Sequence, residues 1–466
     1  KGNFATGTQN LPQRIAILDE ANTANQAGLS TDPIEITSLQ QAANEYGYGS
    51  PVYQIMRILR PENGGGVEVP TLVYAQAETG VAASRDITPT GTATGNGVHT
   101  LVINGRDNLG GANYDFNIVT GDTVALITAK ITDVVNAALG SPVGATDNTT
   151  KVTALSKWAG LTSEGLNITV NTNGDGLGPS VQAALDLFGS NWNTIVVNSY
   201  GAPAMDTLEA FNGIPDPTTP TGRYAAIVVK PFIALMGETS KVIADYQTLT
   251  NGRKVEVTNS ICPAPGSVAL PMEAAANMAV LFANQTNSNP HLDVAAKFYP
   301  DMPIPSDGDI GAMGVYENRD LLVKDGSSTV DLVSDRFQVM DFITTYRPDG
   351  ETPPQFRYCR NIMIDLNIFF GYHLLEEQFV IDHAIAADDD IVKVNKVVKP
   401  KSWTAVVRAY AHDLSERGLI ADYPFMQNSI LVGLSISNPD RLETAFDYKR
   451  SGFARISSTT ASRWIC

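Results

Sequence analysis

Residues 173–178 read N-G-D-G-L-G, a glycine-rich stretch that could cradle a phosphate group. A dinucleotide-binding loop needs the spacing G-x-G-x-x-G between a strand and a helix, and a P-loop needs a lysine after its last glycine. Here the glycines fall at every second position, and no such lysine follows. The favoured interpretation is therefore an interdomain turn. An α/β enzyme with a ligand crevice near residues 174–178 stays open as an alternative.

Three consecutive aspartates, Asp388, Asp389 and Asp390, could supply oxygen ligands to a divalent cation. Calcium loops, however, place carboxylates at alternating positions and add a distal glutamate. A run of like charges in a loop is usually solvated. We therefore favour a solvated acidic loop over a metal site.

A basic band directly follows this acidic run. Its members are Lys393, Lys396, Lys399 and Lys401. A solvated loop is the plainest interpretation of such a band. The alternative is a docking surface for an acidic protein partner, because complementary charge guides protein association.

Other signals for catalysis or metal binding are weak. The five histidines are scattered, and none falls in a metal spacing such as H-E-x-x-H. The chain has no G-x-S-x-G turn typical of serine hydrolases. Its three cysteines are far apart and form no C-x-x-C pair, which disfavours a zinc site or a disulfide framework. We expect no cofactor, no bound metal and no enzyme activity.

The composition describes a large globular chain. Its 466 residues predict about three domains, and a hydrophobic fraction of 43% can fill several cores. The net charge of −17 repels nucleic acid and anionic membranes overall. No apolar run approaches the roughly 18–20 residues of a membrane span, and the first residues lack the apolar core of a signal peptide. We expect a soluble product of a cytoplasm, with no nucleic-acid partner and no membrane insertion.

The elements that would position these residues predict a multidomain protein of mixed α/β (α+β) class. Residues 12–76 predict the order strand, helix, helix, strand, with Ser38 and Gln41 as a capping box and Ser50–Pro51 as the second helix start. Residues 77–175 are rich in Thr, Gly, Asn and Val. They predict an inserted β-rich domain with one helix, capped by Asp122.

The second half of the chain alternates between helices and strands. Residues 176–310 predict an α/β middle domain with a buried sheet. Its helices are expected at 181–188, 205–211, 232–246 and 271–283, and its strands at 194–197, 224–229 and 254–258. Residues 311–450 predict a further module, with a strand at 337–346, a long apolar helix at 359–384, a helix from Ser402 and a strand at 429–436. Residues 1–11 and 451–466 predict short polar terminal arms.

The order of several segments resembles the contractile tail sheath proteins of myophages, in the Mu-type branch. Residues 36–47 and 49–56 resemble an early helical segment of that family, and 101–106 with 120–124 resemble its inserted β domain. Residues 319–326 are similar to its E-R-x-x-L-L-x-x-G segment, with looser spacing. The I-T-T-Y-R at 343–347 and the N-P-D-R-L at 438–442 resemble the family's I-T-T-Y-R and D-P-N-R-L.

This resemblance implies a structural subunit. Sheath subunits stack as hexameric rings around a rigid tail tube, and their contraction drives the tube through the host envelope for genome ejection. The implied partners are neighbouring sheath subunits, the tail tube, and the baseplate and tail terminator proteins. The implied location is a virion assembled in the host cytoplasm. Residues 12–76 and 311–450 would form the two parts of an inner core, with the middle and inserted domains further out.

The resemblance also implies that the terminal arms add strands to sheets of neighbouring subunits, where main-chain hydrogen bonds supply the affinity. The residues expected to take part are Asn3, Phe4, Thr6, Phe453, Arg455 and Ile456. The lysine band becomes a possible contact with the tail tube. Two alternatives stay open: the sheath of a phage-derived bacteriocin or injection machine, and a surface-binding protein whose region 78–173 contacts host glycans.

Overall fold

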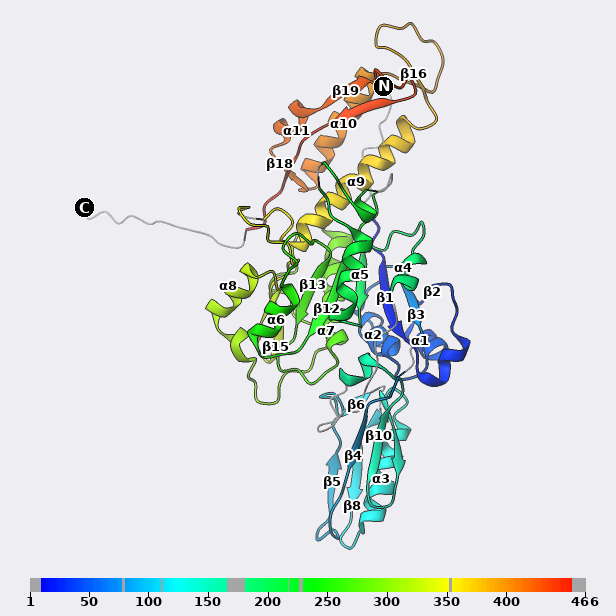
Figure 1. Ribbon diagram of the computed structural model, residues 1–466, viewed down its shortest axis with the longest axis vertical. Helices are drawn as coiled ribbons and strands as arrows, with labels where there is room; N and C mark the ends of the chain where they lie inside the picture. The colour runs from blue at the N-terminus through cyan, green and yellow to red at the C-terminus, as the bar shows by residue number, and fades with distance from the viewer. Residues whose placement is uncertain are drawn as a thin grey trace, which may run out of the picture. The chain divides into compact units, whose positions relative to one another are not determined.

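The structure is a computed structural model. It describes all residues except 1–9, 78–79, 110–111, 166–180, 217, 226–228, 352–353 and 455–466 (Figure 1). The chain divides into two compact units. We call residues 13–284 and 294–359 the core unit, and residues 1–12, 285–293 and 360–466 the C-terminal unit.

The core unit is built on a six-stranded sheet with the strand order β13–β12–β11–β1–β3–β2 (Figure 1). Its strands are β1 (Ile15–Glu20), β2 (Ile34–Glu35), β3 (Thr71–Gln76), β11 (Ile195–Asn198), β12 (Ile233–Glu238) and β13 (Asn259–Pro263). All neighbours are parallel except β2 and β3. Every residue of β1 is buried, as expected for a central strand of a parallel sheet that is covered on both faces.

Helices and one hairpin surround this sheet in the core unit. They are α1 (Leu39–Tyr46), α2 (Pro51–Leu59), α4 (Val181–Asp186), α5 (Ala202–Asn212), α6 (Ile243–Thr250), α7 (Pro271–Ser288), α8 (Tyr316–Lys324) and the hairpin β14 (Thr329–Val333) with β15 (Arg336–Asp341). Short 3-10 helices lie at Thr23–Gly28, Leu161–Gly165, Gly222–Tyr224 and Gly311–Gly314. Aromatic packing joins this layer to the sheet, since the rings of Tyr74 on β3 and Phe188 lie 4.6 Å apart.

The starts of α1 and α2 confirm the predicted caps. The Ser38 hydroxyl accepts a hydrogen bond from the Gln41 N–H at 3.2 Å, and the Ser50 hydroxyl accepts one from the Tyr53 N–H at 3.1 Å. The reciprocal bond of the capping box reaches one residue further back than predicted. The Gln41 side chain accepts from the N–H of Thr37 rather than of Ser38.

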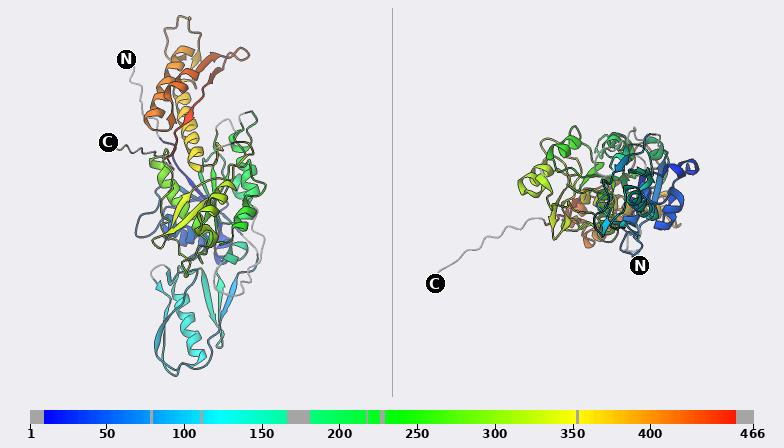
Figure 2. Two further views of the ribbon diagram at one scale, coloured as in Figure 1. Left: turned by 90° about the vertical axis from the view of Figure 1, so that its left-hand side faces the viewer. Right: turned by 90° about the horizontal axis from the view of Figure 1, so that it is seen from below.

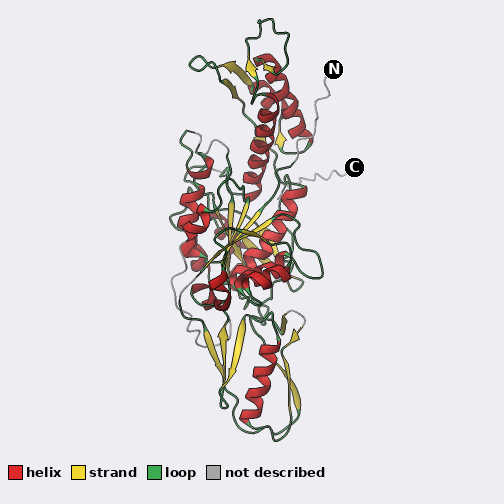
Figure 3. Cartoon of the chain, turned by 90° about the vertical axis from the view of Figure 1, so that its right-hand side faces the viewer, coloured by secondary structure: helices red, strands yellow, loops and turns green. Residues whose placement is uncertain are grey.

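An inserted β-rich region follows β3. It comprises β4 (Ser84–Ile87), β5 (Gly97–Thr100), β6 (Asn108–Leu109), β7 (Ala112–Asn113), β8 (Asp115–Ile118), α3 (Val124–Ala137), β9 (Val143–Asp147) and β10 (Val152–Ser156). The strands form an antiparallel β4–β10–β9 sheet and the hairpins β5–β8 and β6–β7. Figure 3 shows α3 packed between the strands. A strand predicted over residues 166–170 lies outside the described residues.

The C-terminal unit is mainly helical. Its elements are α9 (Cys359–Phe379), β16 (Ala384–Ile385), β17 (Val397–Val398), α10 (Pro400–Glu416), β18 (Ile420–Ala421), α11 (Tyr423–Ser429), β19 (Leu431–Leu434), β20 (Leu442–Ala445) and β21 (Lys449–Arg450). Figure 2 shows α9 in yellow beside α10 in orange. Trp403, Tyr410 and Leu414 of α10 pack with Ile364 and Ile368 of α9 in one apolar core.

Several predicted elements are wrong. Residues 232–246, predicted as one helix, contain β12 and the start of α6, because an apolar run does not by itself distinguish a buried strand from a helix. The strand predicted at 254–258 lies at Asn259–Pro263 instead. Tyr224 ends a 3-10 helix, and residues 226–228 of the predicted strand 224–229 lie outside the described residues. The cap of α3 is Thr123, not Asp122.

The strand pairing also differs from the predicted grouping of segments. We expected residues 12–76 to join residues 311–450, yet β1 pairs with β11 from Ile15↔Ile195 to Leu18↔Asn198. The first segment therefore shares its sheet with the predicted middle domain. The boundary between the two units falls after Cys359, inside the predicted second part of the inner core. In the part of the chain that the structure describes, no helix has the length and apolarity needed to cross a membrane.

Candidate functional site

The C-terminal unit carries a two-stranded antiparallel hairpin, β19–β20. The strands pair from Leu431↔Ala445 to Leu434↔Leu442, and among the described residues neither strand pairs with a third. The backbone N–H and C=O groups along such edges are a template for a further strand. The hairpin is therefore a candidate acceptor of an extended chain segment.

The inner face of this hairpin is fixed to the helices. Val432 and Leu442 pack against the apolar core of the unit. The Trp403 indole N–H also donates a 2.9 Å hydrogen bond to the Thr444 hydroxyl. Because these contacts hold one face, the strand edges are presented by a pre-organised hairpin, which lowers the entropic cost of adding a strand.

The rest of the hairpin is open to solvent. A groove of about 760 Å³ runs along it, lined by Tyr372 and Glu376 of α9 and by residues 431–433 and 441–445. Burial raises the pKa of the Glu376 carboxyl, although the nearby His373 acts in the opposite direction. Leu431 is 69% exposed and Ile436, beyond the end of β19, is fully exposed. These exposed apolar side chains make the hairpin a candidate interaction surface.

The predicted lysine band does not form one free surface. The Lys396 amine pairs with Asp382 at 2.8 Å, and the Lys399 amine donates to the carbonyl oxygens of Asp388 and Asp390. Lys393 and Lys401 are exposed. Two of the four lysines are thus engaged within their own loop, and the predicted tube contact stays a prediction.

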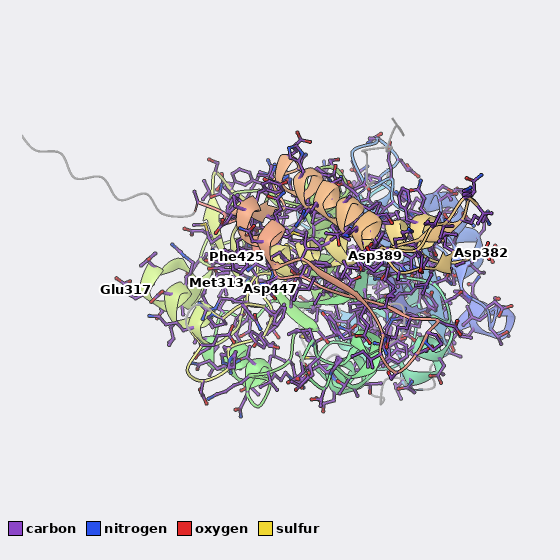
Figure 4. The ribbon with its side chains drawn as sticks, turned by 90° about the horizontal axis from the view of Figure 1, so that it is seen from above. Met313, Glu317, Asp382, Asp389, Phe425 and Asp447 are labelled. Carbon is purple, nitrogen blue, oxygen red and sulfur yellow. The ribbon has the colours of Figure 1, made fainter. Side chains whose placement is uncertain are left out.

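The acidic run is part of the same loop, which carries Asp382 and Asp389 between α9 and α10 (Figure 4). The Asp388 carboxylate accepts from the Lys401 N–H at 2.9 Å, and the Asp390 carboxylate accepts from the Ala387 N–H at 2.8 Å. These two aspartates therefore bind backbone N–H groups. Across the described residues, no group of three or more His, Cys, Asp or Glu side chains converges as metal ligands would.

Of the six residues predicted for strand exchange, Phe453 is described. Its ring lies 5.9 Å from the Arg360 guanidinium carbon. Asn3, Phe4, Thr6, Arg455 and Ile456 lie outside the described residues, as does the glycine-rich stretch 173–178 of the enzyme alternative. The strand-exchange role of the arms therefore stays a prediction.

Three polar side chains on α9 were not predicted as functional residues. Arg360, Asp365 and Asn367 are at most 5% exposed, although they lie on a helix predicted to be apolar. The signal was present in the sequence, because Asp365 and Asn367 interrupt an otherwise apolar run. A buried polar or charged side chain is normally held by a specific partner.

No protein-family model matches the chain. The Mu-like prophage FluMu tail sheath protein of Haemophilus influenzae is 23% identical to it over 186 residues. That stretch covers 36% of this chain and 37% of the relative, so the chain spans little more than a third of the length of the curated relative it matches. This match confirms the resemblance to Mu-type tail sheath proteins that the sequence motifs predict.

The chain is also similar to solved sheath structures. The sheath tail protein from Desulfitobacterium hafniense is 12% identical, with a TM-score of 0.47 and coverage of 97% of this chain and 98% of that chain. The sheath tail protein from Listeria innocua is 12% identical, with a TM-score of 0.48 and coverage of 96% and 94%. The contracted helical sheath of the anti-feeding prophage is 11% identical, with a TM-score of 0.47 and coverage of 99% of this chain and 97% of that chain.

The mixed α/β, multidomain class is confirmed by the helices and sheets described above. The relative matched by sequence is a tail sheath protein, which is a structural protein and not an enzyme.

Proposed function

We propose that this protein is the sheath subunit of a contractile phage tail or of a phage-like contractile injection system. The observation that carries the proposal is the match to a Mu-like prophage tail sheath protein. In this function, subunits stack as hexameric rings around a tail tube, and contraction drives the tube through the envelope of a host cell.

The hairpin β19–β20 supports a mode of assembly. Its free edges would receive strands from the terminal arms, residues 1–11 and 451–466, of neighbouring subunits. Strand addition obtains its affinity from main-chain hydrogen bonds, so polar arms without a core of their own suit it. Because the arm and the acceptor are different segments of the chain, each contact would be head-to-tail and would generate an open polymer rather than a closed dimer.

Contraction needs an energy difference between two states of the polymer. A few kcal/mol per subunit is sufficient, because many subunits shift together and each contributes to the same equilibrium. Contacts with the tube must then be released without breaking a core. Exposed charges such as Lys393 and Lys401 suit such a contact, since exposed ion pairs contribute little to stability.

The proposed partners follow from this function. They are other copies of this chain, the tube protein inside the sheath, and the baseplate and terminator proteins at its ends. Assembly would take place in the cytoplasm of the host, before the tail becomes part of the virion. A bacteriocin or an injection machine would use the same contacts.

Negative-stain electron microscopy of the purified protein at rising concentration tests the proposal. We expect striated tubes or stacked rings above a critical concentration. A chain truncated after Arg450 should keep its circular dichroism spectrum and lose the polymer. Discrete particles at every concentration, for both chains, would contradict the proposal, and tubes that survive the truncation would contradict the role of the C-terminal arm.

A cavity in the inserted region favours glycan binding as a second candidate function. It measures about 600 Å³ and is lined by the stacked rings of His99 and Phe116, by Ile127 and Ile131, and by several threonines. An aromatic platform with a polar rim suits a sugar ring. Binding of the full chain to a glycan array, lost in Phe116→Ala, would support this function, and an array without binding would contradict it.

A further inference from the structure

Each of the three buried polar side chains of α9 contacts a segment at one end of the described chain. Arg360, Asp365 and Asn367 all face partners within the C-terminal unit. Burying a charge without a partner costs several kcal/mol, so the geometry of these partners matters for the unit.

Asp365 holds the C-terminal segment. Its carboxylate accepts from the Nε of Arg450 at 2.6 Å and from its Nη2 at 2.5 Å. The Tyr448 hydroxyl donates to the same carboxylate at 2.8 Å. A two-pronged arginine–carboxylate pair is both strong and specific in direction. The segment therefore lies on α9 in one orientation just before residue 451.

Arg360 lies about one and a half turns before Asp365 on α9 and also holds the C-terminal segment. Its Nη2 donates to the carbonyl oxygen and to the hydroxyl of Ser451, both at 2.9 Å. Its Nε donates to the carbonyl oxygen of His291 at 2.6 Å, which fixes the guanidinium in the unit. The aromatic ring of Phe453 lies against the same guanidinium. Residues 448–453 are thus held at two points.

Asn367 holds the N-terminal segment. Its side-chain oxygen accepts from the N–H of Leu11 at 2.7 Å, and its side-chain nitrogen donates to the Met363 carbonyl at 2.8 Å, which fixes the amide. The neighbouring Asn10 is held as well. Its oxygen accepts from Arg417 at 2.5 Å, and its nitrogen donates to the carbonyl oxygen of Asn287 at 3.2 Å.

We propose that α9 is a common clamp for both chain ends, in which Asp365, Arg360 and Asn367 are positioning residues that fix where the two terminal arms leave the subunit. With a rise of about 1.5 Å per residue, the three side chains lie within roughly 11 Å along one helix axis. Both arms therefore depart from one rigid element. The role of the clamp in polymer formation rests on the proposed sheath function, while the clamp itself is a property of the single subunit.

Fixing an arm at its root raises the effective concentration of that arm at an acceptor sheet of a neighbour. Loosening the root spreads the arm over a larger volume and weakens the polymer without changing the arm or the acceptor. This is the readout that separates a positioning role from a contribution to folding alone.

Hydrogen exchange measured by mass spectrometry on the unassembled full chain tests the clamp. In Asp365→Asn we expect amide exchange in residues 448–454 to rise about tenfold or more, because the carboxylate charge that holds Arg450 is lost. In Asn367→Leu we expect the same for residues 10–12. Glu377→Gln is the matched control, since Glu377 lies on the same helix with a side chain that is 55% exposed. Unchanged exchange in both variants would overturn the clamp.

The same variants are then compared for polymer formation. We expect the critical concentration to rise about tenfold in Asp365→Asn and Asn367→Leu, and to stay at the wild-type value in Glu377→Gln. Arg450→Lys keeps the positive charge but loses the two-pronged contact with Asp365. It serves as the test variant if Asp365→Asn does not fold. Faster exchange with unchanged polymer formation would overturn the positioning role. A wild-type chain that forms no polymer would refute the proposed function, while the exchange experiment still decides on the clamp.

Discussion

The side-chain amine of Lys157 donates a 2.8 Å hydrogen bond to the carbonyl oxygen of Leu139, just beyond the end of α3. The same amine donates to the carbonyl oxygen of Tyr48, just beyond the end of α1, at 3.2 Å. Carbonyl groups at a helix C-terminus carry partial negative charge, which offsets part of the cost of burying the cation. One half-buried amine therefore joins the inserted region to the segment that follows the first helix of the core unit.

This amine predicts a pH dependence of stability. Burial lowers the pKa of Lys157 from 10.5 to about 8. Between these two values the unfolded chain binds more protons than the folded chain, so the free energy of unfolding rises with pH over that window. Below pH 8 the amine is charged in both states and its contribution is constant.

Urea unfolding at pH 8.0, 9.0 and 9.5 checks this prediction. The free energy of unfolding of the wild type, relative to Lys157→Met, should increase across the series by about 1–2 kcal/mol, since each unit of pKa shift corresponds to about 1.4 kcal/mol. Lys151→Met is the control, because Lys151 is about half exposed. Parallel pH profiles for the wild type and Lys157→Met would contradict the assignment.

Two arginines and two carboxylates form a second joint in the core unit. Arg106 lies 2.7 Å from Glu273 and 2.8 Å from Asp301, and Arg57 contacts the same two carboxylates. The Glu273 side chain is 2% exposed, so each arginine compensates a buried charge. Arg106 comes from the inserted region, whereas Glu273 lies on α7. The network therefore ties this region to the sheet-forming part of the unit.

Removing Arg106 should destabilise the protein strongly. We expect Arg106→Met to lower the free energy of unfolding by about 3–5 kcal/mol, because a buried carboxylate loses a partner. The matched control removes the lysine of the Lys151–Asp86 pair, whose side chains are 43% and 45% exposed. Lys151→Met should cost less than about 1 kcal/mol. Equal effects of the two substitutions in urea unfolding would show that the network contributes no more than a surface pair.

Gly237 on β12 permits a close approach of the chain at the start of α7. A Cβ atom at this position would lie 1.5 Å from the carbonyl oxygen of Pro271. Because that neighbour is backbone at a strand–helix contact, it has little freedom to move. We expect Gly237→Ala to lower the free energy of unfolding by about 3 kcal/mol or more, or to prevent folding.

The control for this prediction is Gly28→Ala, in the 3-10 helix after β1. A Cβ atom there would meet no heavy atom within 4 Å. Gly28→Ala should change the free energy of unfolding by less than about 1 kcal/mol, as ordinary surface substitutions do. A Gly237→Ala protein as stable as Gly28→Ala would mean that α7 can shift away from β12 at little cost.

Elements of this fold could be predicted where neighbouring residues in the sequence specify them, and not where distant residues do. The Ser50 cap and Pro51 specify the start of α2 within three residues, and both were found. The strand β13 was misplaced because Asn259 and Ser260 look like turn residues. In the fold, the Asn259 amide bonds to Glu209 and the Ser260 hydroxyl bonds to the Ile343 carbonyl, and both partners are distant in sequence.

The same limit applies to the candidate site. The apolar pattern of the 429–436 strand was visible, but the open edges of the hairpin follow from its tertiary surroundings. The partner of Asp365 could not be predicted either, because Arg450 lies 85 residues further along the chain. The pairing of β1 with β11 was not predicted for the same reason, since this parallel pairing crosses a long stretch of chain.

The outward face of the hairpin provides the last prediction. Val432 and Thr444 face the helices, so Leu431, one residue before Val432, faces away and is 69% exposed. A lysine there should change the free energy of unfolding by less than about 0.5 kcal/mol, because no packed contact is lost. It should nevertheless oppose association, since a charge must be desolvated when a neighbour covers this face.

Light scattering during concentration of the full chain checks this outcome. We expect Leu431→Lys to raise the critical concentration for polymer formation about tenfold or more, which corresponds to at least about 1.4 kcal/mol per contact. Ile391→Lys is the matched control, since Ile391 is 90% exposed on the loop that carries the lysine band. That loop is proposed to meet the tube rather than another subunit, so Ile391→Lys should leave polymer formation by the sheath chain alone unchanged. If the two lysine variants behave alike, the hairpin is not the surface through which copies of this chain associate.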